Sequence, residues 1–574
     1  MLARRASQVR KPPLSLIGDF ETEGATKGVT SGEISFLHFV RSREDAGDGD
    51  EVLEDQRGRK HGDVGGSGDV VRDRSRSPHH QRWRTDAEPD DGAPPPLRFN
   101  PRCTPGVQLP LNSGNPSPGK IFSYIFDSEV FRLITENTNK NAARNQEKGG
   151  KFTWTKMSQR EAKKFIGLLL YMSVLDLPRM TDFWRQSTIF HVPFPATVMT
   201  RERFMAILSS LHFSDPEKDE ENEQKKSTED YDPLHQVRPL MEMIRTISKT
   251  IYHPKQHLSV VERMVGTKQC MKTKPTNRRF KLFVLADING YTVDFKLYTG
   301  KSKTASGKGL SFDVVSSLVN RDYLGSGYLV YTDIYTSPVL FRHLSQQGFG
   351  ACGIYRQGID GVPTTKENDL TKRSPPGSIR WIRDGDLLFV KWMGTREVSM
   401  CSTIHPMYSG DTVQRWQKTV TVFNKYTEGV DTSDQMIGTS AVRRKTRRWP
   451  IMVFHHLVDI AVTNSFVIHK TRCESLREKP LTRQQFLEEV AAHLLGVDLK
   501  SDLQKNPDQH LPVPTRSGQT KSQRASMGRR RCKVCSKSTP WKCWTCDVGL
   551  CLQPERNCHW QFHQHLKRSQ GAEN

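Results

Sequence analysis

The run Leu329-Val330-Tyr331-Thr332-Asp333 is apolar and β-branched, and it ends in a carboxylate. Such a run predicts a buried strand that delivers Asp333 to the end of a sheet. Further along the chain, Gly429-Val430-Asp431-Thr432-Ser433-Asp434 supplies more carboxylates. Acids in this arrangement are typical of a two-metal phosphoryl-transfer site, in which two divalent cations stabilise the attacking and leaving oxygens.

A third acidic position is expected upstream, and the segment placed to supply it is Leu258-Ser259-Val260-Val261-Glu262-Arg263-Met264. The position expected for the first metal-binding Asp holds Val261, whose side chain offers no oxygen to a hard cation. Glu262 is adjacent, but neighbouring side chains on a strand point to opposite faces. The sequence therefore predicts an incomplete acidic triad, unless a bulge at the strand end turns Glu262 inward.

Composition favours a multidomain protein with a polyanionic partner. The 574 residues are enough for roughly three or four domains. Lys and Arg number 86 against 63 Asp and Glu, a net charge of +23, so nucleic acid is the leading candidate partner. No apolar run approaches the roughly 20 residues that span a bilayer, which predicts no membrane association. Dispersed cysteines without a secretory signal suit a reducing compartment.

The composition and the pattern of apolar residues change several times along the chain. A Gly-, Asp-, Arg- and Pro-rich start predicts disorder, and a helical period begins near Ile121, with Ser158 and Thr200 as helix caps. Strands dominate from about residue 258, including a hairpin with Asn289-Gly290 at its turn. The predicted segments are 1–100 (disordered), 101–257 (helical), 258–470 (mixed sheet with helices and a β-rich insertion at about 357–422), 471–530 (helical segment and basic linker) and 531–566 (cysteine-rich).

The C-terminal cysteines have the spacing of a zinc domain. Two CxxC pairs are followed by further soft ligands, a pattern that predicts two tetrahedral sites with one ligand still to be identified. His565 or His559 could complete the second site, and zinc would supply folding energy that so short a segment lacks. The predicted ligands are Cys532, Cys535, Cys543, Cys546, Cys551, Cys558, His563 and His565.

Two basic segments are candidates for DNA backbone contacts. The first lies next to Asp434, and the second directly precedes the cysteine pairs and also suits a nuclear import signal. Either segment can also be a solvated charge run. The residues concerned are Arg444, Lys445, Arg447 and Arg448 in the first segment and Arg529, Arg530 and Arg531 in the second.

Together these motifs, in this order and at this spacing, resemble the piggyBac transposase family over about residues 100 to 565. The resemblance implies an α/β protein with a ribonuclease H-like (DDE transposase) core and a β-rich insertion. It also implies an N-terminal helical dimerisation and DNA-binding domain and a C-terminal zinc-binding cross-brace or ribbon. By the same resemblance, Asp333, Asp431 and Asp434 match catalytic acids that hold magnesium, and insertion favours TTAA.

The chain departs from the family at Val261 and in the stretch Gly266 to Cys270, which is shorter than expected. We therefore expect a nuclear, homodimeric, transposase-derived DNA-binding protein that does not cleave DNA and needs magnesium only if cleavage persists. Two alternatives remain open. One is an active cut-and-paste transposase, and the other is a chromatin or protein-interaction module.

Overall fold

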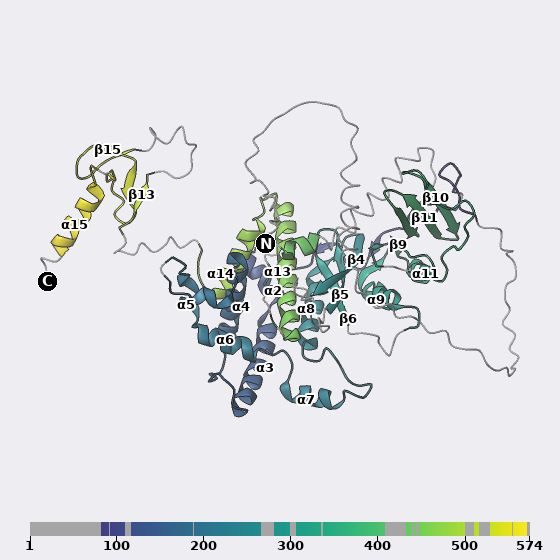
Figure 1. Cartoon of the computed structure of the whole chain (residues 1–574), viewed down its shortest axis with the longest axis horizontal. Helices are drawn as coiled ribbons and strands as arrows, with labels where there is room; N and C mark the ends of the chain where they lie inside the picture. The colour runs from purple at the N-terminus through teal and green to yellow at the C-terminus, as the bar shows by residue number, and fades with distance from the viewer. Residues whose placement is uncertain are drawn as a thin grey trace, which may run out of the picture. The chain divides into compact units, whose positions relative to one another are not determined.

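The structure is a computed structural model of the whole chain (Figure 1). It describes residues 82–90, 92–109, 116–187, 189–265, 280–298, 306–334, 337–407, 432–438, 441–442, 446, 448–499, 510–515, 529–553 and 555–570. The chain forms two compact units, which are Met1–Gln108 with Ser248–Gln435 and Leu109–Ile247 with Met436–Asn574. Each unit is described by itself.

The first unit is built on a mixed β-sheet. Strand β4 lies in the middle, antiparallel to β5 on one side and parallel to β8 on the other, with β6 beyond β5 and β9 beyond β8. Three antiparallel strands followed by two parallel ones constitute the ribonuclease H-like core predicted from the sequence. The strands are β4 (His257–Val265), β5 (Phe280–Asp287), β6 (Thr292–Tyr298), β8 (Leu329–Thr332) and β9 (Gly350–Ile354).

Helices make the connections that parallel strands require. They are α9 (Leu310–Leu318), α10 (Arg321–Leu324) and α11 (Pro338–Gln346). The predicted hairpin is confirmed, because β5 and β6 pair around a turn in which Gly290 has a φ of 87° and its amide donates to the carbonyl of Asp287 at 2.9 Å. A positive φ is the reason that glycine suits this turn position.

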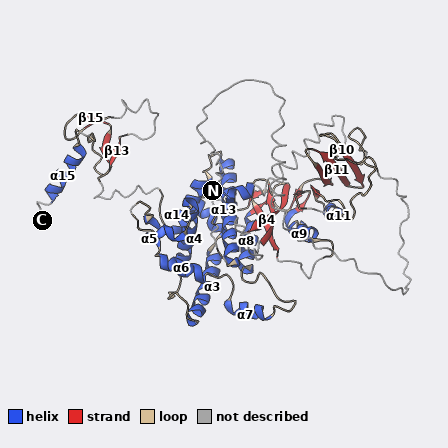
Figure 2. Ribbon diagram, viewed as in Figure 1, coloured by secondary structure: helices blue, strands red, loops and turns tan. Residues whose placement is uncertain are grey.

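The β-rich insertion continues the same sheet. Its three strands are antiparallel, and β12 pairs with β9, so the sheet has eight strands within the described residues. Figure 2 shows these strands in red. They are β10 (Ile379–Asp384), β11 (Leu387–Met393) and β12 (Glu397–Ser402). Residues 408–422, the end of the predicted insertion, lie outside the described part of the chain.

The segment 82–109 is ordered, which corrects the prediction of disorder for 82–100 and of a helical domain starting at 101. Trp83 is fully buried, and its indole donates to the carbonyl of Thr365 at 2.9 Å. Arg84 and Trp381 exchange two backbone hydrogen bonds of 2.8 and 3.0 Å. One buried tryptophan and two backbone hydrogen bonds produce no periodic pattern of apolar residues, so the sequence did not predict that this segment is ordered. The short strands here are β1 (Asn100–Pro101) on β7 (Gly325–Ser326) and β2 (Gly106–Val107) on β3 (Tyr252–His253).

The second unit is mainly helical (Figure 2). The predicted caps are confirmed, since the hydroxyls of Ser158 and Thr200 each accept a backbone N–H at 3.2 Å. Helices α4 and α14 approach closely at Gly167, where a Cβ atom would lie 2.8 Å from a Leu495 side-chain carbon. The helices are α2 (Pro118–Ile125), α3 (Ser128–Glu147), α4 (Gln159–Leu175), η1 (Met180–Trp184), α5 (Pro193–Val198), α6 (Arg201–Ser210), α7 (Pro216–Gln224), α8 (Arg238–Ile251, ending in the first unit), α13 (Trp449–Leu476) and α14 (Arg483–Leu495).

Helix α13 forms the centre of this helical unit. Among the described helices it is long and apolar enough to cross a membrane, but 94% of its most apolar window is buried inside the protein. Burial of that kind is typical of a core helix. The apolar stretch from Ile451 to Ile468 is therefore part of the helical core.

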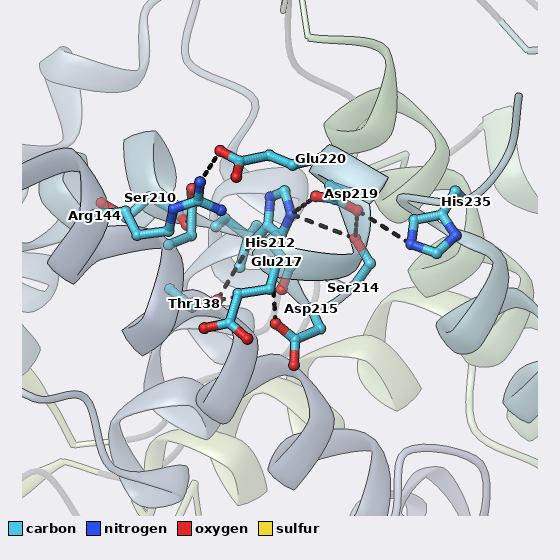
Figure 3. A network of polar contacts seen from close by, with 12 residues as sticks. Thr138, Arg144, Ser210, His212, Ser214, Asp215, Glu217, Asp219, Glu220 and His235 are labelled. Atoms are coloured by element: carbon cyan, nitrogen blue, oxygen red, sulfur yellow. Dashed lines mark hydrogen bonds and ion pairs between the residues drawn. The ribbon is translucent and has the colours of Figure 1, made fainter. Parts of the chain in front are cut away.

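A buried polar network anchors α7 and the loop before α8 (Figure 3). Asp219 accepts hydrogen bonds from His212 at 2.5 Å and Ser214 at 2.6 Å, and His235 lies 3.4 Å away. Burial raises the pKa of Asp219, but the hydrogen bonds from His212 and Ser214 more than offset it, so the pKa lies below its ordinary value. The ionised carboxylate therefore stabilises the folded helical unit.

We expect Trp83→Ala to release the segment 82–90 from the sheet. Emptying a fully buried tryptophan site costs about 3–5 kcal/mol, which a single short segment cannot offset. Amide hydrogen exchange across 82–90 should rise steeply. Ala87→Ser, a change at an exposed position of the same segment, is the control and should leave exchange unchanged. Equal protection in Trp83→Ala would contradict the docking of this segment.

We expect Asp219→Asn to lower the unfolding free energy of the helical unit by about 2–3 kcal/mol near neutral pH, because the charged acceptor is lost. A depressed folded-state pKa gives stability that is present above the unfolded value of about 4 and lost as pH falls through the folded value. The difference between native protein and variant, measured by chemical denaturation, should shrink below about pH 4. A difference that stays constant with pH would show that Asp219 is not ionised in the folded state.

Candidate catalytic face and metal centres

The pairing of β4 with β8 places Val261 beside Asp333. Val260 is the register partner of Thr332, the last residue of β8, and Val261 and Asp333 are the residues that directly follow this pair. Val261 is 3% exposed and Asp333 is 5% exposed. Val261 therefore stands at the position where the family resemblance expects the first carboxylate, on the strand that pairs with the one leading to Asp333.

Glu262 does not replace the missing acid. It is the register partner of Phe283, and it lies on the other face of β4 from Val261. There its carboxylate forms a 3.4 Å ion pair with Lys281 of β5. The described part of β4 pairs without a register shift against β5, so the bulge that would turn Glu262 inward does not form there.

Arg263 is a buried charged residue beside the expected acids that the sequence analysis did not single out. It lies two positions after Val261, on the same face of β4, and it is 2% exposed. Its guanidinium forms an ion pair with Asp434, which lies in the helical segment 432–438 and whose side chain is 42% exposed. The available signal was a charged side chain two positions after the apolar Val261 and in phase with it along the strand. Asp431 lies outside the described residues.

These side chains do not fit a pair of magnesium ions. Magnesium requires oxygen ligands in a near-octahedral arrangement. Valine supplies none at the first position, and the arginine places a permanent positive charge beside one of the acids. The described side chains of this face therefore lack the oxygen ligands that a two-magnesium centre requires.

The C-terminal domain brings its cysteines and histidines into two groups of four among the described residues. The first is Cys532, Cys535, Cys551 and Cys558, in which the Cys535 and Cys551 sulfurs lie 3.6 Å apart. Ligand atoms about 2.0–2.3 Å from a tetrahedral ion stand about 3.3–3.8 Å apart, so this group could hold a metal. The domain's elements are β13 (Pro512–Pro514), β14 (Arg530–Arg531), β15 (Ser538–Thr539), β16 (Trp541–Cys543) and α15 (Cys558–Gln570).

The second group is His510, Cys543, Cys546 and His563. The Cys546 sulfur lies 3.3 Å from His510 Nδ1 and 3.6 Å from His563 Nε2. His563 Nδ1 donates to the carbonyl of His559 at 2.7 Å, which leaves Nε2 available as a ligand atom. The two groups alternate along the chain, as in a cross-brace.

His510 takes the eighth ligand position, which corrects the prediction of His565 and its alternative, His559. His510 precedes the first CxxC pair by more than twenty residues, so spacing within the cysteine-rich segment could not reveal it. It is brought in by the pairing of β13 with β16, in which Pro512 is the register partner of Cys543. The metal-binding domain therefore begins before residue 531.

The basic residues predicted to contact DNA differ in whether their side chains are exposed or already bonded within the protein. Arg448 donates to the carbonyls of Leu208, Ser209 and Leu211 at 2.7–3.0 Å, so it caps the C-terminus of α6. Burial lowers its pKa, and a phosphate role is corrected to a structural one. Arg529, Arg530 and Arg531 are exposed, as the prediction requires. Three further predicted contacts, Arg444, Lys445 and Arg447, lie outside the described residues.

Comparisons with known proteins agree with this geometry. Human piggyBac transposable element-derived protein 3 is 26% identical over 475 residues, covering 78% of this chain and 76% of the relative. The human chimeric ERCC6-PGBD3 protein is also 26% identical over 475 residues, which cover 42% of its length. The model of the family described as Transposase IS4 matches residues 117–466, more than half of the chain. The chain belongs to the piggyBac transposase family.

A solved structure supports the fold of this family member. The cryo-EM structure of the piggyBac transposase synaptic complex with hairpin DNA has a TM-score of 0.58 at 22% identity. The match covers 68% of this chain and 83% of that one. The family match confirms the resemblance inferred from the motifs. The structural match supports the predicted core fold.

We expect His510→Ala to remove one of the two bound metal ions per chain, because a site with three remaining ligands binds far more weakly. Elemental analysis of the purified full-length protein counts the metal. His565→Ala is the matched control and should retain both ions. Loss of metal from His565→Ala instead of His510→Ala would overturn the assignment.

Proposed function

We propose that this chain is a transposase-derived, nuclear DNA-binding protein that does not cleave DNA. The observation that carries the proposal is Val261 beside Asp333, with Glu262 directed to the other face of the sheet. Two-metal cleavage needs both ions to stabilise the attacking and leaving oxygens, so loss of one carboxylate ligand removes the reaction. Binding to the DNA backbone uses other residues than the metal ligands, so the loss of a carboxylate leaves binding possible.

DNA binding is supported by charge and by exposed arginines. The net charge of +23 favours binding through phosphate neutralisation and counterion release. Arg529, Arg530 and Arg531 stand exposed at the start of the metal-binding domain. The related transposase structure is a complex with hairpin DNA, which supports the same partner for this chain. We extend the proposal to a homodimer that binds transposon ends, as the family resemblance implies.

We also propose that the two C-terminal metal groups hold zinc. Four thiolates form one group, and two thiolates with two imidazoles form the other. Such closed sets of four soft ligands, without a position for water, are typical of structural zinc. The ions would stabilise the fold that presents Arg529–Arg531.

The native chain should show no Mg²⁺-dependent nicking of its matched transposon end, and Asp333→Asn should behave identically. The substrate is a duplex made from the repeats that flank the coding sequence, with its TTAA target, and a scrambled duplex is the comparison. An active piggyBac transposase on its own ends is the positive control. Robust nicking by the native protein, abolished in Asp333→Asn, would establish the active transposase and overturn the proposal.

Replacing Arg529, Arg530 and Arg531 with Ala should weaken binding to matched and scrambled duplexes alike. If all three contact phosphates, the slope of log affinity against log salt should fall by about 2–3 units. Replacing three exposed basic residues of the insertion, Arg356, Lys372 and Arg373, is the charge-matched control and should change the slope less. Native binding with no salt dependence would favour a protein-interaction module.

A further inference from the structure

The catalytic face of this chain contains its own buried cation. Arg263 lies in the central strand β4, between β5 and β8, and is 2% exposed. Arginine stays charged in proteins, so its guanidinium brings a permanent positive charge into the interior. A buried charge of this kind requires a paired acid, and Asp434 supplies it.

The partner of Arg263 is one of the acids expected to hold metal. Asp434 belongs to the acidic motif that the sequence places at the site, and the side chain of Arg263 emerges on the same face of β4 as Val261. A carboxylate paired with a guanidinium has part of its oxygen capacity occupied. The same guanidinium repels any divalent cation that approaches the neighbouring acids.

We propose that Arg263 takes the place of a divalent metal on this face, holding Asp434 and its helical segment 432–438 against β4 and excluding magnesium. The inference rests on the proposed loss of cleavage and adds a second cause to the missing carboxylate. Val261 removes a ligand, and Arg263 supplies the charge that the ligand set would otherwise attract. Restoring aspartate at position 261 is therefore insufficient to restore metal binding.

The test measures Mn²⁺ binding by isothermal titration calorimetry, with the full-length, zinc-loaded protein and no DNA. The native chain and Val261→Asp should show no saturable binding on this face. The double variant Val261→Asp, Arg263→Ser should show saturable binding at concentrations at least tenfold below the highest at which Val261→Asp shows none, and adding Asp333→Asn should abolish that binding. If Val261→Asp alone binds as tightly as the double variant, or the folded double variant does not bind, the proposal is overturned.

A second measurement keeps the proposal testable where the serine variant does not fold. Arg263→Met keeps an unbranched apolar stem in the buried position and removes the guanidinium with its charge, so hydrogen exchange should rise at least tenfold in 432–438. Lys281→Met breaks the Glu262 pair on the opposite face and should leave that segment unchanged. Unchanged exchange in Arg263→Met would show that the guanidinium does not hold Asp434.

These outcomes are separate from the nicking assay. Nicking by the native chain would refute the proposed function, whatever Arg263 does. Mn²⁺ binding by Val261→Asp alone would refute the role of Arg263 and leave the missing carboxylate as the cause of inactivity.

Discussion

The parallel pairing of β4 with β8 is the constraint on which the functional reading of this protein depends. The register that joins Val260 to Thr332 places Val261 next to Asp333 and leaves no freedom to choose another neighbour. A shift of one residue would exchange the faces of the strand, bringing Glu262 to Asp333 and taking Arg263 away from Asp434. The uninterrupted pairing of β4 with β5 on the other side makes such a shift costly.

Charge on this face is balanced within the protein. A metal site concentrates carboxylates and relies on cations for neutrality, whereas here Arg263 neutralises Asp434 and an apolar valine stands beside Asp333. Glu262 and Lys281 make a second pair on the opposite face. The described part of this face therefore combines the family's fold with a guanidinium–carboxylate pair.

The basic residues in the rest of the chain fall into two groups, those that bond to the protein itself and those that are exposed. Arg448 is committed to three carbonyls at the end of α6, and Arg383 forms a buried ion pair with Asp90 that fastens the segment 82–92 to the insertion. Arg529, Arg530 and Arg531, in contrast, remain exposed next to the cysteine-rich domain, although Arg530 also forms a 3.3 Å ion pair with Asp547. Net charge alone does not distinguish these classes, because it does not count desolvation or hydrogen bonding.

The sequence by itself determined what depends on neighbouring residues. Alternating and β-branched runs predicted β4, β5, β6 and β8, and the Asn289-Gly290 pair predicted the hairpin. The spacing of cysteines and histidines predicted seven of the eight side chains in the two C-terminal groups. The absence of an oxygen ligand at Val261 could also be predicted from the sequence, because it depends only on the identity of that one side chain. Motif order was sufficient to indicate the family.

The tertiary structure decided what depends on residues far apart in the chain. His510 joins Cys543 through strand pairing, Arg263 meets Asp434, and Trp83 is buried near Thr365. Arg448 changed from an expected phosphate contact to a helix cap for the same reason. No local period or spacing encodes such contacts, since they arise from the register of a sheet and the packing of distant segments.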